Sequence, residues 1–460
     1  MPRERASVFI STGEDVEALT RPDPDTPFHI LVAGDFTGGA GAARKAIPID
    51  RDTFEAVFSA LSPVLEIPFV GAPLRIEFRE FEDFHPDRLF ERLPPFQALG
   101  DLRRRLSDPA TFAAAAAEMA PPTAAPSPTP LAGPPPDLAG LSGADILNLM
   151  MGEAPAREKS PDRCEWDQLL HDMVAQYAQP RPDPRQPELI AQADAAITGF
   201  MRVVLHHPLF QSLESNWRAL DFLVRRLETG EDLKMAIVDM PHAEAVSEAG
   251  LAHLRRALAA EARAVIAALY YFSPAEEPAL LRLAALARSG GAPLIGGLAP
   301  DVVGLTGVFS ELRRSPDARW MGLALPRFLL RLPYGRDTSE ADTFDFEEMP
   351  VPAAHERYLW GNPAAACACL LGEAFTRQGW AMLPGAIDII EGLPLHVYQE
   401  DGESVLKPCA EVHLTEESAT LLLERGFMPL VSIKGADRVR LLRFQSVADP
   451  LAPLAGRWKQ

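Results

Sequence analysis

The stretch most suggestive of chemistry is glycine-rich and spans residues 34–44, with the sequence GDFTGGAGAAR. It follows an apolar run at 28–33 that is consistent with a buried strand. A glycine-rich loop between a strand and a helix can hold a phosphate with its backbone amides. However, the stretch lacks the Gly-Lys-Ser/Thr ending of a P-loop, Arg44 stands where a dinucleotide motif has Gly or Ala, and Pro48 interrupts the following helix. We therefore expect an exposed loop, with nucleotide binding at residues 34–41 as the alternative.

The cysteines and histidines do not form a recognisable metal or catalytic pattern. Cys367 and Cys369 are one residue apart, whereas zinc sites space paired cysteines by two to four residues and add a second ligand pair. We interpret both as small buried side chains. His206 and His207 precede Pro208 at an expected helix end, where one should bond to the local backbone. No Gly-x-Ser-x-Gly elbow occurs. The sequence therefore predicts no catalytic, cofactor-binding or metal-ligating residue.

The charge balance is strongly acidic, with 64 acidic and 44 basic residues in 460 and a formal net charge of −20. This argues against binding along a nucleic-acid backbone, which requires dense Lys and Arg. The four cysteines are too few for a disulfide scaffold and favour a reducing compartment. The first residues lack the features of a signal peptide, and the apolar run at 264–272 is too short to span a bilayer. We expect a soluble cytoplasmic protein without membrane insertion.

A proline-rich tether is expected at residues 121–136, with the sequence PPTAAPSPTPLAGPPP. Proline at this density removes amide donors and blocks helices, so the stretch should be extended and semi-rigid. It divides the chain into a first domain at 1–117, a tether region at 118–160 and a larger domain at 161–460.

Hydrophobic periodicity predicts a mixed α/β fold for both domains. Before the tether we expect strands at 28–33 and 74–78, a helix at 54–61 and an arginine-rich helix that includes Leu99. After it, expected helices cover 197–205, 213–224, 245–269, 279–288 and 418–425, the last ended by Gly426. Expected strands lie at 233–238 and, as a hairpin, at 427–434 and 438–444. The hairpin is apolar and should pack against the first domain or the core of its own half.

Several blocks of the first domain resemble the small sheath subunit of the bacterial type VI secretion system. These blocks are PFHILVAGDFTG at 27–38, IDRDTF at 49–54, FEDFHPD at 81–87 and LGDLRRRL at 99–106. Together they cover about residues 6–117. Glu82 stands where the family's turn has Asp.

The larger domain resembles the large sheath subunit of the same system over about residues 165–460. The blocks are HPLFQSLESNWRAL at 207–220, LPRFLLRLPYG at 325–335, FDFEE at 344–348, YLWGNPA at 358–364, the stretch 375–380, and 416–450 with GFMPL and FQS. Two departures stand out. The subunits are ordinarily separate chains, and the segment 273–300 is compressed relative to the family.

The resemblance implies a structural subunit rather than an enzyme, with no cofactor. Such subunits assemble into a helical tube around an inner tube and contract to drive effector delivery. The implied partners are further sheath protomers, the inner-tube protein and the baseplate. An α/β enzyme that binds a nucleotide at residues 34–41 is the alternative.

Aromatic and arginine side chains of these blocks are the expected interface or structural residues: Trp217, Arg218, Arg327, Arg331, Glu347, Trp360 and Phe444. Aromatic anchors and planar guanidinium groups suit such contacts. In the block at 325–335, alternating Phe328, Leu330 and Leu332 suggest a strand with the arginines on its other face. A pair between Arg331 and Glu347 is one hypothesis, and ordinary solvated charges are the alternative.

An AAA+ unfoldase is a further candidate partner, because the large subunit family carries a short N-terminal helix that such an unfoldase grips after contraction. The matching place is 141–152, LSGADILNLMMG, and the expected contacts are Ile146, Leu147, Leu149 and Met150. A helix packed permanently on its own domain is the preferred interpretation of this segment.

Overall fold

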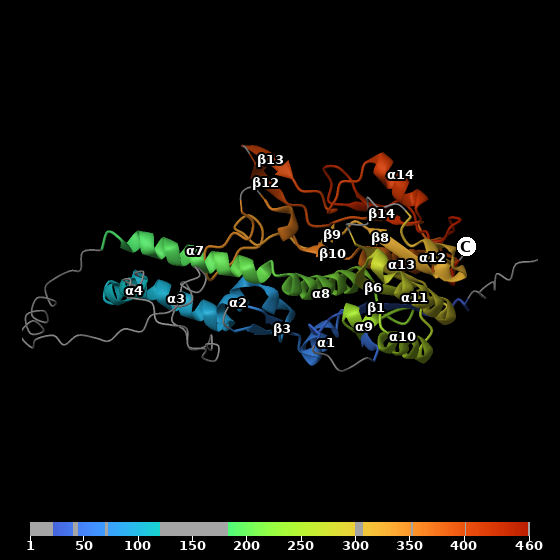
Figure 1. The fold of residues 1–460 in the computed structure, drawn as a ribbon, viewed down its shortest axis with the longest axis horizontal. Coiled ribbons are helices and arrows are strands. Elements are labelled where there is room, and N and C mark those ends of the chain that lie inside the picture. Colours follow the sequence, from blue (N-terminus) through green and yellow to red (C-terminus); the bar gives the residue numbers. More distant parts are fainter. Residues whose placement is uncertain are drawn as a thin grey trace, which may run out of the picture.

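The computed structural model describes residues 22–39, 45–69, 72–119, 183–299, 307–350, 353–400 and 402–458. In this part of the chain a nine-stranded mixed sheet is covered by helices on both faces, and a helical arm extends away from it (Figure 1). The mixed α/β prediction is confirmed. The tether at 121–136 and the helix expected at 141–152 lie outside the described residues. The division of the chain into three regions, with boundaries at 117/118 and 160/161, therefore remains a prediction.

The first and second halves of the chain share one sheet. Strand β1 (Phe28–Gly34) lies between β5 (Leu233–Asp239) and β6 (Val265–Phe272) and pairs in parallel with both. The order across the sheet is β11-β15-β14-β8-β7-β6-β1-β5-β2. The other members are β2 (Ile47–Ile49), β7 (Leu294–Leu298), β8 (Met321–Leu325), β11 (Ile389–Ile390), β14 (Met428–Ser432) and β15 (Val439–Leu441). An interior strand of the sheet thus comes from the first half of the chain.

Both faces of β1 are buried, as expected for a parallel strand inside a sheet. Ile30 and Val32 join one hydrophobic cluster with α8 (Pro208–Arg226) and α13 (Pro363–Gln378). Leu31 and Ala33 join a second cluster with α10 (Glu248–Ala260) and α11 (Glu277–Gly290). The alternation of side chains along one strand therefore builds the two layers of core.

The helix predicted at 245–269 is wrong in its second half. Helix α10 ends at Ala260, and the run Val265–Phe272, VIAALYYF, forms the buried strand β6. A short continuous apolar run cannot be assigned to helix or strand by periodicity alone. Val265–Phe272 is buried between two layers of helices, and this environment suits an apolar strand.

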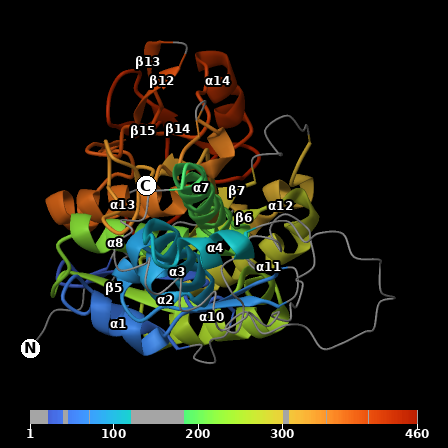
Figure 2. The same cartoon turned by 90° about the vertical axis from the view of Figure 1, so that its left-hand side faces the viewer.

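The rest of the first half lies beside the sheet and in the arm (Figures 1 and 2). Its elements are α1 (Phe54–Leu61), β3 (Val64–Ile67), β4 (Leu74–Glu77), a 3-10 turn (Phe81–Phe84), α2 (Pro86–Arg92), α3 (Pro94–Ser107) and α4 (Phe112–Glu118). The long helix α7 (Gln186–Leu205) of the second half runs along α3, and Ala193 packs with Leu102, Leu106 and Phe112. The arm is therefore also built from both halves.

The C-terminal elements complete the far side of the sheet. They are α14 (Glu416–Glu424), the antiparallel pair β9 (Phe328–Leu329) and β10 (Trp360–Gly361), and the hairpin β12 (Val397–Glu400) and β13 (Glu403–Leu406). Short helices α9 (His242–Ala245) and α12 (Ser310–Arg314) connect strands on the other side. The predicted hairpin is confirmed: β14 pairs with β15 and, in parallel, with β8 of its own half.

Candidate functional site

Helix α8 carries an unusual amount of buried polar surface. His207 caps it, because its Nδ1 accepts a hydrogen bond from the Leu209 amide at 3.3 Å, which confirms the expected local backbone bond. Glu214, Ser215 and Asn216 lie in consecutive positions and are all buried. Buried polar groups are costly unless they are hydrogen-bonded. The partners of these side chains therefore indicate what the helix is built to hold.

A guanidinium group bridges two buried carboxylates at the centre of this region. Arg331 Nε lies 2.8 Å from Glu214 Oε1, and Arg331 Nη1 lies 2.7 Å from Glu348 Oε2. Glu214 and Glu348 are 0% and 1% exposed, and Arg331 is 8% exposed. Arginine suits this position because its planar fork binds two carboxylates at fixed angles. The arrangement joins α8 to the segments before and after residue 340.

Three further side chains close the ion network around Arg331. Arg218 donates to Glu214 Oε1 at 2.7 Å and to the Tyr334 hydroxyl at 2.9 Å. His206 Nε2 lies 3.3 Å from Glu348 Oε1. Two arginines thus face two glutamates, so the network of Glu214, Arg218, Arg331 and Glu348 is balanced in charge. We call these four residues, with His206 and Tyr334, the buried ion network.

The surroundings of Glu348 and Arg331 in the network favour the charged forms of both side chains. Burial acts to raise the pKa of Glu348, but Arg331 and hydrogen bonds from His206 and the Tyr334 amide lower it to about 2. Burial also acts to lower the pKa of Arg331, yet Glu214 and Glu348 raise it well above its ordinary value. Glu348 and Arg331 therefore stay charged at neutral pH, and removing one of them would leave the other without its buried ion-pair partner.

The predicted pair between Arg331 and Glu347 is wrong, because the partner is the adjacent Glu348. Glu347 is exposed, its side chain accepts a hydrogen bond from the Arg336 amide at 3.0 Å, and its carbonyl accepts from Arg202. Neighbouring side chains of an extended segment point to opposite sides. The predicted strand pattern at 328–332 is wrong for the same segment, since β9 ends at Leu329 and Arg331 turns inward.

The glycine-rich loop after β1 docks against α8 through its backbone. Trp217 Nε1 donates to the Phe36 carbonyl at 2.9 Å, and Asn216 Nδ2 donates to the Asp35 carbonyl at 3.0 Å. From β5, Asp239 accepts from the Phe36 amide at 2.8 Å and from the Thr37 hydroxyl at 2.9 Å. The Phe36 amide and the Thr37 hydroxyl, the donors among these groups, are thus hydrogen-bonded to the second half of the chain.

The expectation of an exposed loop is wrong for its first residues, since Phe36 and Thr37 are 0% and 2% exposed. Gly38 has a φ of +72°, and a Cβ there would lie 2.3 Å from the Val64 carbonyl oxygen. After the gap at 40–44, the next described element is strand β2 and not a helix. The described residues 34–39 of the loop therefore form a packed joint.

Aromatic rings surround Trp217 on the side of the first half. The Trp217 ring lies 4.5 Å from Phe58, 5.2 Å from Phe36 and 5.7 Å from Phe54, measured between centroids. Trp217 itself is fully buried. Aromatic pairs in such tilted and edge-on arrangements add to the free energy of burial. The predicted structural role of Trp217 therefore consists in holding the two halves together.

The remaining predicted residues are distributed around this centre. Trp360 is linked to α8 because its carbonyl accepts from the Ser215 hydroxyl at 2.9 Å. Arg327 pairs with Glu411, with Nε 2.7 Å from Oε2, and does not join the buried ion network. Phe444 is buried in the core. Ile146, Leu147, Leu149 and Met150 lie outside the described residues.

The sequence reasoning missed Glu214, Asn216 and Asp239. The sequence carried a signal for Glu214 and Asn216, because the stretch LESN at 213–216 places polar residues on the apolar face of an amphipathic helix. Such residues require buried partners. No comparable local signal marked Asp239, because its partners are about 200 positions away.

Other kinds of site find no support in the described part of the chain. There, no group of three or more His, Cys, Asp or Glu side chains could hold a metal ion. Cys367 and Cys369 are both buried, as predicted, and this burial raises the pKa of their thiols. Among the helices in the same ranges, none is long and apolar enough to cross a bilayer.

Comparison with known proteins identifies two families along the chain. Residues 19–119 match the family described as "Type VI secretion system, VipA, VC_A0107 or Hcp2". Residues 187–253 and 306–448 match VipB, described as the EvpB/VC_A0108 tail sheath N-terminal domain. The stretch between the two VipB matches, 254–305, includes the segment 273–300.

A curated relative extends this result. The type VI secretion system sheath protein TssC1 of Pseudomonas aeruginosa is 30% identical over 304 residues, which cover 57% of this chain and 61% of the relative. The chain thus spans about three fifths of the length of that protein.

Proposed function

Because the chain joins a region of the type VI secretion small sheath subunit family to a region of the large sheath subunit family, we propose that it is a structural subunit of a contractile sheath. The observation that carries the proposal is the position of β1. This strand belongs to the small-subunit region and lies between β5 and β6 of the large-subunit region. One chain thus supplies both parts of a sheath building block.

The contacts between the halves suit a unit that bears load. Trp217 and Asn216 hold the loop after β1, and Asp87 of α2 accepts from the Asp342 and Thr343 amides, both at 3.0 Å. The buried ion network fixes α8 at the centre of these contacts. In this proposal force passes through the fused unit without separating its halves, and contraction changes the packing between units.

The partners follow from the same proposal. Repeated head-to-tail contacts between protomers generate an open helical assembly. The sheath would surround an inner-tube protein, begin at a baseplate and assemble in the cytoplasm. An AAA+ unfoldase that grips Ile146, Leu147, Leu149 and Met150 belongs to the proposal as a recycling step.

The proposal assigns the chain no catalytic activity and no bound nucleotide. The loop at 34–41 is the place where a nucleotide would be expected, and the described part of that loop is hydrogen-bonded to α8 and β5. No observation favours the enzyme alternative. Saturable micromolar binding of ATP or NAD in calorimetry would contradict this part of the proposal.

Live-cell microscopy tests the proposed function. A fluorescent protein fused to the chain should form rods that extend across the bacterial cell and then shorten abruptly. Deleting the gene for the inner-tube protein should abolish the rods, which provides the control. Diffuse fluorescence in cells that secrete normally would contradict the sheath assignment.

A further inference from the structure

A basic cavity lies beside the edge strand β2, away from the buried ion network. Its volume is about 690 Å³, and residues of β2, β5 and α10 line it. Four cationic side chains and one carboxylate contribute to the lining: Lys45, Lys234, Arg256, Arg263 and Glu261. A positive cavity runs against the net charge of −20 of the whole chain. We call this cavity the basic pocket.

The floor of the basic pocket contains buried donors that lack partners. The Arg263 side chain is 3% exposed, and its Nη2 lies 2.9 Å from Glu261 Oε2. Among the described residues, Arg263 Nε and His29 Nε2 are buried and have no hydrogen-bond partner. Burial lowers the pKa of both groups, and Glu261 only partly offsets the effect. An additional carboxylate would satisfy this floor.

The rim of the basic pocket also carries unmatched charge. Lys234 and Arg256 are exposed, and neither takes part in an ion pair within the described ranges. Cationic side chains held close together repel one another until an anion enters. The rim therefore adds attraction for an acidic group approaching from solvent.

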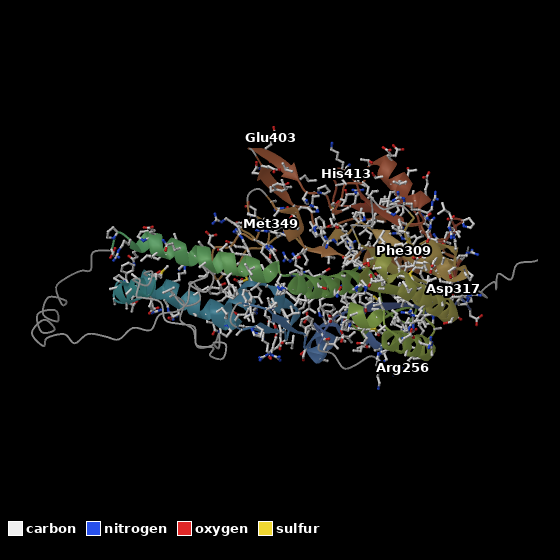
Figure 3. The ribbon with its side chains drawn as sticks, in the orientation of Figure 1. Arg256, Phe309, Asp317, Met349, Glu403 and His413 are labelled. Carbon is white, nitrogen blue, oxygen red and sulfur yellow. The ribbon has the colours of Figure 1, made fainter. Side chains whose placement is uncertain are left out.

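An acidic element lies on the opposite face of the molecule. The β12–β13 hairpin projects from the body (Figure 1). Glu400 and Glu403 are directly paired at the end of its two strands. Like charges in directly opposed positions destabilise a hairpin. Figure 3 places Glu403 at one extreme of the molecule and Arg256 at the other, and Figure 2 shows the same separation of the hairpin from α10. Among the described residues neither glutamate takes part in an ion pair, although the Glu400 carboxylate accepts a hydrogen bond from the Tyr398 hydroxyl. A cationic group from another copy would offset the repulsion between the two carboxylates.

We propose that the basic pocket of one copy receives the β12–β13 hairpin tip of the next copy, with Glu400 and Glu403 pairing with Lys234 and Arg256. This proposal rests on the proposed sheath function. Two different patches on opposite faces form a heterologous contact, which builds an open helical assembly when the rotation between successive copies does not close a ring. The contact is exposed at its rim and therefore weakens as salt rises.

Zero-length cross-linking tests the contact in the full-length wild-type protein. Nitrogen-15-labelled and unlabelled chains are mixed, treated with a carbodiimide and digested for mass spectrometry. We expect mixed-isotope links that join Lys234 to Glu400 or Glu403. Absence of these links, with other intermolecular links present, would overturn the proposal even if tubes form. If the links occur but no tubes form, the contact stands and the sheath assignment fails.

Charge-reversal variants provide a second test of the proposed contact. Glu403→Lys with Glu400→Lys, or Lys234→Glu with Arg256→Glu, should each reduce assembly several-fold at low salt, measured by sedimentation. Combining all four reversals should restore assembly, because the charges match again. Arg255→Glu is the control, since Arg255 is exposed on the same helix and does not line the basic pocket. Equal assembly of the reversed and control variants, with unchanged melting temperatures, would overturn the proposal.

A small anion is the competing occupant. Calorimetry with inorganic phosphate distinguishes the two, because the proposal expects no saturable binding to the unassembled protein. Saturable phosphate binding that Arg256→Glu abolishes, together with missing cross-links, would assign the basic pocket to a small anion.

Discussion

Arg331 lies between two buried glutamates that no other described arginine contacts together, and its removal would leave both without their shared cation. Breaking a buried ion pair by removing one partner costs far more than the pair contributes as a whole. This residue therefore allows a direct test of the buried ion network.

Arg331→Met should lower the free energy of unfolding by about 3–5 kcal/mol, because Glu214 and Glu348 lose the buried cation that both of them contact. Denaturant unfolding measures the change. Arg336→Met is the matched control, because Arg336 is 68% exposed and pairs with the exposed Asp345. The control should change stability by less than about 0.5 kcal/mol. Similar losses for both variants would show that the network does not hold the fold.

Glu348 predicts an acid-sensitive step in stability. Its pKa is lowered to about 2 in the folded protein, from an ordinary value of 4.5. A lowered folded pKa stabilises the fold above pH 4.5, and this contribution is lost as pH falls from 4.5 towards 2. The stability difference between wild type and Glu348→Gln should therefore shrink over that range in denaturant titrations. A difference independent of pH would contradict the assignment, and Glu347→Gln serves as the control.

At the residue scale the sequence identified part of the site. Trp217, Arg218 and Arg331 were selected because aromatic and guanidinium groups recur in the resembling blocks, and all three contact α8 or lie on it. The acidic partner was assigned to the wrong neighbour, Glu347. The direction of a side chain depends on how an irregular segment enters the core, and no local pattern specifies this.

At the scale of elements, the loop after β1 is the joint between the halves. Gly38 and Gly39 both have positive φ, at +72° and +83°, so both favour glycine. They differ in space, because a Cβ at Gly38 meets the Val64 carbonyl at 2.3 Å and a Cβ at Gly39 meets nothing within 4 Å. Comparing substitutions at Gly38 and Gly39 therefore separates the cost of the backbone conformation from the cost of a steric clash.

Gly38→Ala should lower the melting temperature clearly more than Gly39→Ala, because only the first forces β3 away from the loop. Differential scanning calorimetry of both variants measures the contrast. Equal shifts would mean that the joint tolerates displacement and that backbone conformation alone matters at this loop.

Helices and strands with a clear hydrophobic periodicity were predicted well. Continuous apolar runs, which fit either a helix or a strand, were not. The strand at 28–33 and the helix at 418–425 are confirmed as β1 and α14 to within two residues. Residues 265–269 were predicted to be the end of a helix at 245–269, but they belong to the apolar strand β6. Its strand character follows from burial between two layers, which is a tertiary effect.

At the scale of the whole molecule, the insertion of β1 between β5 and β6 was not predictable from the sequence. Strand order depends on contacts between residues about 200 positions apart. The family resemblance implied two joined subunits, and the structure adds that they share one sheet. A strand paired on both sides should not leave the sheet easily.

Cutting the chain within residues 121–136 should leave the halves associated, because seven residues of β1 pair with β5 and four also pair with β6. A protease site inserted there, followed by gel filtration at micromolar concentration, measures the outcome. Uncut protein is the control. Clean separation of the fragments would contradict the shared sheet.

The central claim is that this single chain builds a sheath, and electron microscopy tests it most directly. Purified protein should be mixed with its inner-tube partner and examined by negative stain, with each protein alone as a control. The account predicts long tubes of uniform diameter around the inner tube. A discrete oligomer of fixed size, unchanged by the inner-tube protein, would contradict it.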